Sequence, residues 1–171
     1  MTTTHDVDGI TITPISEIDR GSVVRMWAAL FHAYEGAGDG GRRVASGERL
    51  DTEIQSWIDL VMPGADHFSL IVRRLGAVRG FVAVSTFIQP WLIPERSATI
   101  GAIWVEPTER LHGLGRLLVV SALEELTRRN VDLADVHAIA SNHRSKPFWQ
   151  SLGFKAFAVQ MRYTVKSLSA M

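Results

Sequence analysis

The chain has 171 residues, 46% of them hydrophobic and 21% charged, with 18 lysines and arginines balanced by 18 aspartates and glutamates. This length and composition predict one globular domain and argue against global disorder. The net charge of zero leaves no basic surplus for nucleic acid, so we expect no nucleic-acid partner. The absence of cysteine excludes disulfides, thiolate metal sites and a cysteine nucleophile.

The first nine residues are polar, and we expect a flexible tail there, followed by a single domain over residues 10–166. The tail lacks the basic region and apolar run of a signal peptide. No uninterrupted apolar run reaches the ~18 residues that a transmembrane helix needs. We therefore expect a cytoplasmic protein without a membrane partner.

The N-terminal part predicts one strand and two helices. Residues 10–15 are apolar and β-branched, and Ser16, with an acidic residue three positions later, is a candidate N-cap for a helix over 17–34. Five glycines between residues 36 and 47 predict a mobile loop. Apolar residues then return at helical spacing over 50–61, which predicts the second helix.

The remaining elements alternate between strands and helices. Two β-rich runs separated by a short turn predict a hairpin over 67–88, and a third run over 97–105 ends at a proline-containing loop. Helical spacing returns over 116–130. The last three expected elements are a strand, a short helix and a strand, at residues 135–141, 145–152 and 154–165.

A glycine-bearing turn from Arg110 to Gly115 joins the strand ending at Val105 to the following helix. Unpaired amides at a helix N-terminus bind phosphate, and Gly113 and Gly115 would let a phosphate approach the backbone. The turn lacks the lysine and hydroxyl of a Walker A loop and the third glycine of a dinucleotide fingerprint. On spacing alone, an ordinary strand-to-helix loop is the alternative.

Two segments resemble motifs of the GCN5-related N-acetyltransferases (GNAT). Val105, Pro107 and Arg110 precede the two glycines as in motif A, where a V-x-P strand end leads into a Q/R-x-x-G-x-G/A pyrophosphate loop. Downstream, Asn142 and the sequence PFWQSLGF at 147–154 are similar to motif B, in which an asparagine precedes an FY-x-x-x-GF helix and turn. The resemblance runs from the predicted hairpin to the last strand.

The resemblance implies a mixed α/β fold, with helices on both faces of a central sheet that splays at the acetyl-CoA cleft. Acetyl-CoA, as co-substrate and without a metal, would lie in the split between the strands at 97–105 and 135–141. The implied contacts come from the strand end, the loop and helix start, and motif B. These residues are Ile103, Trp104, Val105, Arg110, Leu111, His112, Gly113, Leu114, Gly115, Arg116, Asn142 and Trp149.

Enzymes of this family generally transfer the acetyl group directly to an amine, and the absence of cysteine is compatible with that route. We therefore expect an N-acetyltransferase acting on a primary amine of a small molecule, such as a polyamine, an amino acid derivative or an aminocyclitol. Two alternatives stay open: acetylation of a protein lysine or N-terminus, and an acyl-CoA-binding module without turnover. Members of the family often form homodimers, so a homodimer is the protein partner to consider.

Direct transfer needs a base for the incoming ammonium and a donor for the departing thiolate. Glu106, just after the strand, is the predicted base, and His143 is the alternative. Trp149 replaces the family's tyrosine donor, and its indole is not a working acid. Tyr163 in the last strand is the predicted donor, and the alternatives are protonation by water or a weak enzyme. His112 lies in the loop, where it can pair with a phosphate. The spacing of the histidines predicts no metal site.

Three tryptophans carry predictions about burial. The apolar spacing of the two N-terminal helices places Trp27 and Trp57 in the core. Trp91 differs, because it lies in the proline-flanked loop PWLIPE, where we expect an exposed aromatic near the acceptor side.

Overall fold

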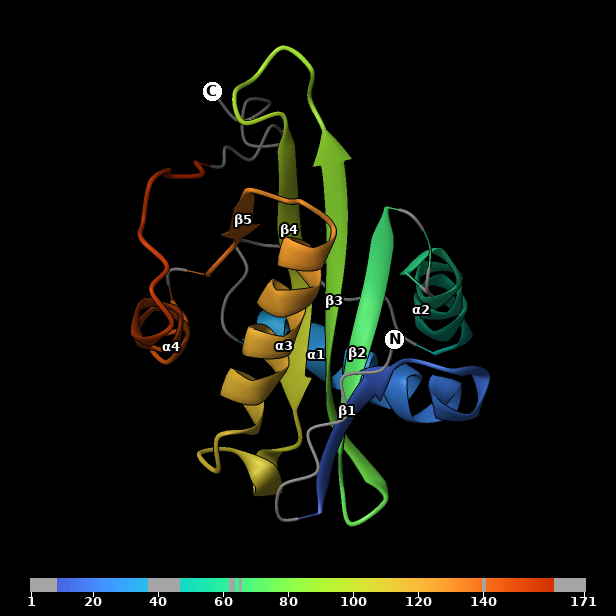
Figure 1. The fold of residues 1–171 in the computed structure, drawn as a ribbon. Coiled ribbons are helices and arrows are strands. Elements are labelled where there is room, and N and C mark those ends of the chain that lie inside the picture. The colour runs from blue at the N-terminus through green and yellow to red at the C-terminus, as the bar shows by residue number, and fades with distance from the viewer. Residues whose placement is uncertain (1–8, 37–46, 62–63, 65, 140, 162–171) are drawn as a thin grey trace, which may run out of the picture.

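The computed structural model describes residues 9–36, 47–61, 64, 66–139 and 141–161. Its centre is a sheet of five strands (Figure 1): β1 (Ile10–Pro14), β2 (His67–Arg74), β3 (Ala77–Ile88), β4 (Arg96–Val105) and β5 (Leu133–Val136). The strands lie in the order β1-β2-β3-β4-β5. Neighbours from β1 to β4 are antiparallel and β5 is parallel to β4, which confirms the expected mixed sheet.

Helices cover both faces of the sheet, as the resemblance implies (Figure 1). They are α1 (Arg20–Gly36), α2 (Glu48–Val61), α3 (Leu114–Arg128) and α4 (Ser145–Ser151), with short 3-10 turns η1 (Glu17–Asp19) and η2 (Pro107–Glu109). On one face, α1 and α2 pack against Phe81 and Ala83 of β3. On the other, α3 and Trp149 of α4 pack against Val82 and Val84. Alternate residues of β3 therefore supply two separate core layers.

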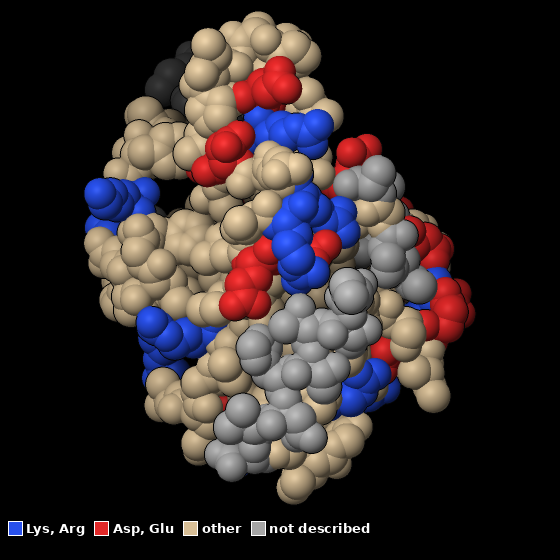
Figure 2. All heavy atoms as spheres, in the orientation of Figure 1, with Lys and Arg blue, Asp and Glu red and all other residues tan. Residues whose placement is uncertain are grey.

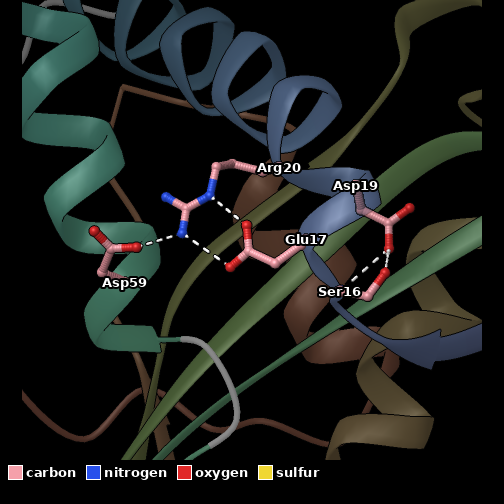
Figure 3. A network of polar contacts seen from close by, with 5 residues as sticks. All are labelled: Ser16, Glu17, Asp19, Arg20 and Asp59. Atoms are coloured by element: carbon pink, nitrogen blue, oxygen red, sulfur yellow. Dashed lines mark hydrogen bonds and ion pairs between the residues drawn. The ribbon is translucent and has the colours of Figure 1, made fainter.

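A capping box lies at the start of η1, which leads directly into α1. The amide and the hydroxyl of Ser16 both donate to Asp19 Oδ2, at 3.1 and 2.6 Å, which confirms the predicted cap. Arg20 joins the two N-terminal helices, because its guanidinium binds Glu17 of η1 and Asp59 of α2 (Figure 3). These contacts link the start of α1 to α2 at the surface.

Gly80 lies where β3, β4 and α3 meet. A Cβ on it would lie 2.6 Å from the Trp104 carbonyl oxygen and 3.3 Å from Leu118 Cδ1. Only glycine therefore fits beside this carbonyl of β4. Leu118 packs over the same position and places α3, and the loop that precedes it, beside the end of β4.

Two expectations about the C-terminal part are wrong. The strand expected at 135–141 is shorter and begins earlier, since β5 ends at Val136. In the strand expected at 154–165, residues 154–161 form no strand, and residues 162–165 lie outside the described residues. Phe157, Val159 and Met161 are exposed. Alternating apolar residues fit a half-buried sheet surface, but no described strand pairs with this segment to create one.

The tryptophans divide between core and surface. Trp27 is 6% exposed and stacks on Phe81, as expected for the core. Trp57 is 50% exposed, so its predicted burial is wrong. The buried stripe of α2 is narrow, repeating every four residues, and it leaves this position facing outward. Trp91 is 77% exposed, as the loop sequence predicts.

Candidate functional site at the open edge of the sheet

The sheet opens between β4 and β5. Their parallel pairing covers four residue pairs and ends at Ile100 with Val136. A bulge at Gly101 follows, and β4 continues to Val105 with no described strand on that side. The last residues of β4 therefore present an open edge beside β5.

The ladder with β3 shows which peptide groups face this open edge. Glu106 N donates to Arg79 O, so the carbonyl of Val105, in the same trans peptide, points away from β3. Peptide groups alternate along a strand, so those of Ile103 and the amide of Val105 also face outward, whereas those of Trp104 face β3. The main-chain contacts predicted at Ile103 and Val105 are accessible, and the one predicted at Trp104 is not.

Arg110 links this edge to the loop that follows it. Its Nε donates to the Val105 carbonyl oxygen at 2.9 Å, and its guanidinium carbon lies 4.5 Å from the centroid of the Trp104 ring. Arg110 thus occupies the last outward carbonyl of β4. The amides of Ile103 and Val105 remain as donors at the edge.

The loop before α3 has the backbone shape of an anion site. Leu111 and Gly113 have positive φ values of 67° and 84°, and His112 between them does not. Alternating handedness turns successive amides toward one concave side. The first hydrogen bond of α3 runs from Leu117 N to Gly113 O. Three amides precede it and stay outside the helix ladder, namely those of Leu114, Gly115 and Arg116.

The short helix α4 packs against the start of α3. A Cβ on Gly115 would lie 3.5 Å from two ring atoms of Phe148 and 3.7 Å from Val105 Cγ2. Arg116 Nη1 also reaches the Ser151 carbonyl oxygen at the end of α4, at 3.4 Å. The segments that resemble motifs A and B therefore meet at the loop.

The motif B side chains have structural contacts. Asn142 is exposed, and its Oδ1 accepts a hydrogen bond from the Arg144 amide in the turn before α4. Trp149 is 5% exposed, and its ring lies 5.1 Å from the rings of both Phe148 and Phe154. The structure therefore places Asn142 at the surface and Trp149 in the core.

The structure describes the predicted base but not the predicted donor. Glu106 is half-buried directly after β4, where it lines a pocket near the start of α1. Tyr163 lies outside the described residues. His112 and His143 are both exposed.

Charges of both signs mix on the surface. Figure 2 shows lysines and arginines interspersed with aspartates and glutamates on one face of the molecule. In the ranges that the structure describes, no three histidine, aspartate or glutamate side chains gather closely enough to hold a metal ion. None of the described helices is both long and apolar enough to cross a membrane.

Two features of the loop do not follow from the sequence analysis. Leu111 has a left-handed backbone, which a glycine or asparagine would signal but a leucine does not. Its side chain is fully exposed, so packing does not require this shape, and such strain is typical of functional loops. For Arg110 the sequence predicts an amide contact, and the structure adds the guanidinium bond to Val105.

Comparison with known sequences identifies related proteins. The family model described as "Acetyltransferase (GNAT) family" matches residues 27–154. The UPF0039 protein C11D3.02c of Schizosaccharomyces pombe is 36% identical over 66 residues, which cover 37% of this chain and 43% of that protein. The match thus spans less than half the length of this curated relative.

Solved structures share the fold. The tetramutant of the BH1408 protein from Bacillus halodurans gives a TM-score of 0.76 at 18% identity, over 90% of this chain and 99% of that one. The aminoglycoside N-acetyltransferase AAC(6')-Iy in complex with CoA gives 0.72 at 15% identity, over 91% and 93% of the two chains. These identities support the fold alone. Because the family model covers most of the chain, including the open edge of β4 and the loop before α3, the protein belongs to the GNAT acetyltransferase family.

Proposed function

We propose that the protein transfers an acetyl group from acetyl-CoA directly to a primary amine of a small molecule. The observation that carries the proposal is the open edge of β4 beside the loop before α3, where main-chain donors for an extended arm and for a pyrophosphate are adjacent. The aminoglycoside enzyme that shares the fold acts, by its name, on an amine-bearing small molecule.

The donors at this site fit the chemistry of acetyl-CoA. The amides of Ile103 and Val105 would pair with the pantetheine arm in the manner of an added strand. The amides from Leu111 to Arg116 would hold the pyrophosphate at the positive end of the α3 dipole. Bound acetyl-CoA supplies the reactive thioester, and the chain supplies its orientation.

In the transfer, the amine nitrogen attacks the thioester carbon, the C–N bond forms and the C–S bond breaks. One proton leaves the amine and one reaches the thiolate. Glu106 and Tyr163 stay the predicted base and donor. A pantetheine arm that runs back along β4 would place the thioester near Gly101. Gly101 is five residues from Glu106, which corresponds to about 16 Å at ~3.3 Å per residue. A proton path from the amine to Glu106 would therefore run through water, and Glu106→Gln tests it by its kcat.

Calorimetric titration with acetyl-CoA tests the cofactor site. We expect the wild-type protein to bind and Gly113→Glu not to bind, because the variant adds a negative charge and backbone strain where the phosphates would lie. Gly47→Glu is the matched control. Gly47 also has a positive φ, of 64°, accepts the first hydrogen bonds of a helix and has open space around its Cβ.

Either of two results would contradict the proposed site. A folded wild-type protein that does not bind acetyl-CoA removes the co-substrate. A loss of binding that is equal in both glycine variants removes the loop as its place.

An acyl-CoA-binding module without turnover is the second candidate. It is favoured by Trp149, which stands where the family has a tyrosine donor and is buried. Thiol release in the presence of a polyamine, an amino acid and an aminocyclitol distinguishes the two functions. Release with any of them supports the enzyme, and binding without release supports the module.

The proposal also includes the predicted cytoplasmic location and the homodimer that the resemblance implies. Sedimentation of the purified chain tests the homodimer. A protein lysine or N-terminus as acceptor would appear as acetylation of a peptide substrate in the same thiol-release assay.

A further inference from the structure

A second candidate site lies on the other side of β4 from the split. An open pocket of about 640 Å³ lies between the start of α1, the turn of the β2–β3 hairpin and the segment after β4. Val78 of its lining packs on the core layer under α1, so the pocket belongs to the α1 face of the sheet. In the strand order, β2 and β3 lie opposite β5 across β4, which separates the pocket from the split.

Three arginines from three elements line the pocket: Arg25 of α1, Arg73 of β2 and Arg79 of β3. Arg73 is already neutralised. Its Nη2 lies 2.5 Å from Asp19 Oδ1, and its Nη1 donates to Thr13 Oγ1 at 2.7 Å. Arg73 therefore belongs to the wall of the pocket and adds no unmatched charge.

The other two arginines lack full charge partners. Arg79 and Arg74 share one carboxylate, that of Glu109. Arg79 Nε lies 3.5 Å from Oε1 and Arg74 Nη1 lies 3.0 Å from Oε2, so two cations face one anion. Arg25 hydrogen-bonds a carbonyl and a hydroxyl of its own helix, and no carboxylate of the described residues pairs with it. Together these arginines leave two positive charges unmatched at the pocket.

Glu106 supplies one charge of the opposite sign. It lines the same pocket, and no cation of the described residues forms an ion pair with its carboxylate. The unmatched groups are thus two guanidinium charges and one carboxylate. Guanidinium groups bind carboxylates through charge-assisted hydrogen bonds, and a carboxylate binds an ammonium in the same way.

We propose that this pocket binds an acidic amino acid. Its two carboxylates would bind Arg25 and Arg79, and its ammonium would bind Glu106. A ligand with this charge pattern would match Arg25 and Glu106, which have no ion-pair partner among the described residues, and would complete the partly matched charge of Arg79. The pocket volume accommodates a molecule of this size. The inference rests on the pocket and needs no bound acetyl-CoA, but it shares Glu106 with the proposed function, in which this residue is the predicted base.

Calorimetric titration with L-glutamate tests this site. We expect saturable binding by the wild-type protein and about tenfold weaker binding by Arg25→Gln, which removes one charged partner. Arg49→Gln is the matched control, because Arg49 is an exposed helical arginine on α2, outside the pocket. Glutarate, with two carboxylates and no ammonium, should bind more weakly than L-glutamate.

Several results would overturn the site. They are no saturable binding of L-glutamate by the folded wild-type protein, equal affinity in Arg25→Gln, or an equal loss in both arginine variants. Equal affinity for glutarate and L-glutamate would remove the ammonium contact and with it the assignment to an amino acid. Urea denaturation of Arg25→Gln beside the wild-type protein shows that the variant is folded. Failure of acetyl-CoA to bind while L-glutamate binds would count against the proposed function alone.

Discussion

The ring of Phe148 in α4 packs on the backbone of Gly115 in the first turn of α3. The same glycine neighbours Val105 at the end of β4, so the strand end, the loop and α4 form one packed unit. The two segments that resemble family motifs therefore depend on each other structurally. A substitution in α4 that disturbs this packing should therefore also shift the amides of the loop before α3.

Two glycines near this unit differ in the space around them. We expect Gly115→Ala to raise the free energy of unfolding by about 0.5–1 kcal/mol, because alanine favours a helix and its Cβ would make ordinary contacts at 3.5 Å. Gly80→Ala should lower it by about 2 kcal/mol, since its Cβ would lie 2.6 Å from a carbonyl oxygen. Urea denaturation measures both. If Gly115→Ala instead lowers the free energy of unfolding, α4 cannot move away from the added Cβ.

The burial of Trp149 predicts a stability role. Trp149→Ala should lower the free energy of unfolding by about 3–5 kcal/mol, as expected for a large core side chain, whereas exposed Trp57→Ala should change it by less than about 1 kcal/mol. Trp149→Phe should keep the affinity for acetyl-CoA. If this variant keeps its stability but binds acetyl-CoA more weakly, Trp149 contacts the cofactor instead.

Local signals explain which elements the sequence predicts well. The helix expected at 116–130 is α3, at Leu114–Arg128, because an apolar stripe and a preceding glycine define it within one segment. Residues 154–161, the described part of the strand expected at 154–165, form no strand for the opposite reason. Alternating apolar residues are the same whether or not a partner strand exists, and pairing is a property of the whole fold.

The features of the candidate site also divide into those that the sequence predicts and those that it does not. The loop before α3 can be predicted from the sequence because a phosphate site needs glycine where the backbone is left-handed, as at Gly113. The sequence does not predict that the Ile103 and Val105 amides face outward, because their direction depends on the register between β4 and β3. The position of Trp149 in motif B suggests a cofactor contact, but its burial depends on Phe148 and Phe154 around it.

Asp19 should be a strong determinant of stability. It is 3% exposed, and it accepts hydrogen bonds from Ser16 and Arg73. Asp19→Ala would leave Arg73 without its carboxylate, so we expect a loss of about 3 kcal/mol in the free energy of unfolding. Asp51→Ala, in the exposed first turn of α2, should cost about 0.5 kcal/mol. Similar losses in the two variants would show that burial adds nothing to the Asp19 contacts.

Glu17 predicts a small dependence of stability on pH. The hydrogen bond and the charge of Arg20 lower the pKa of Glu17 below its ordinary value of 4.5 (Figure 3). A carboxylate with a lowered pKa stabilises the fold above its unfolded-state pKa, and this contribution is lost as pH falls through the folded-state pKa. The stability difference between the wild-type protein and Glu17→Gln should therefore be constant at neutral pH and shrink below the ordinary pKa. Urea denaturation between neutral and acid pH measures it, and a difference that does not change with pH would contradict the effect.

Arg110 should couple the strand end to the loop. Arg110→Ala removes the bond to the Val105 carbonyl and the stacking on Trp104, so we expect about tenfold weaker acetyl-CoA binding. Arg110→Lys should not restore the affinity, because the ammonium of lysine lacks the planar guanidinium that stacks on Trp104 and donates to the Val105 carbonyl at the same time. Arg128→Ala, which breaks an ion pair with Glu125 within α3, is the control and should bind normally. Full affinity in Arg110→Lys would mean that the site needs only a positive charge there, and that the bond to Val105 is not what holds the loop.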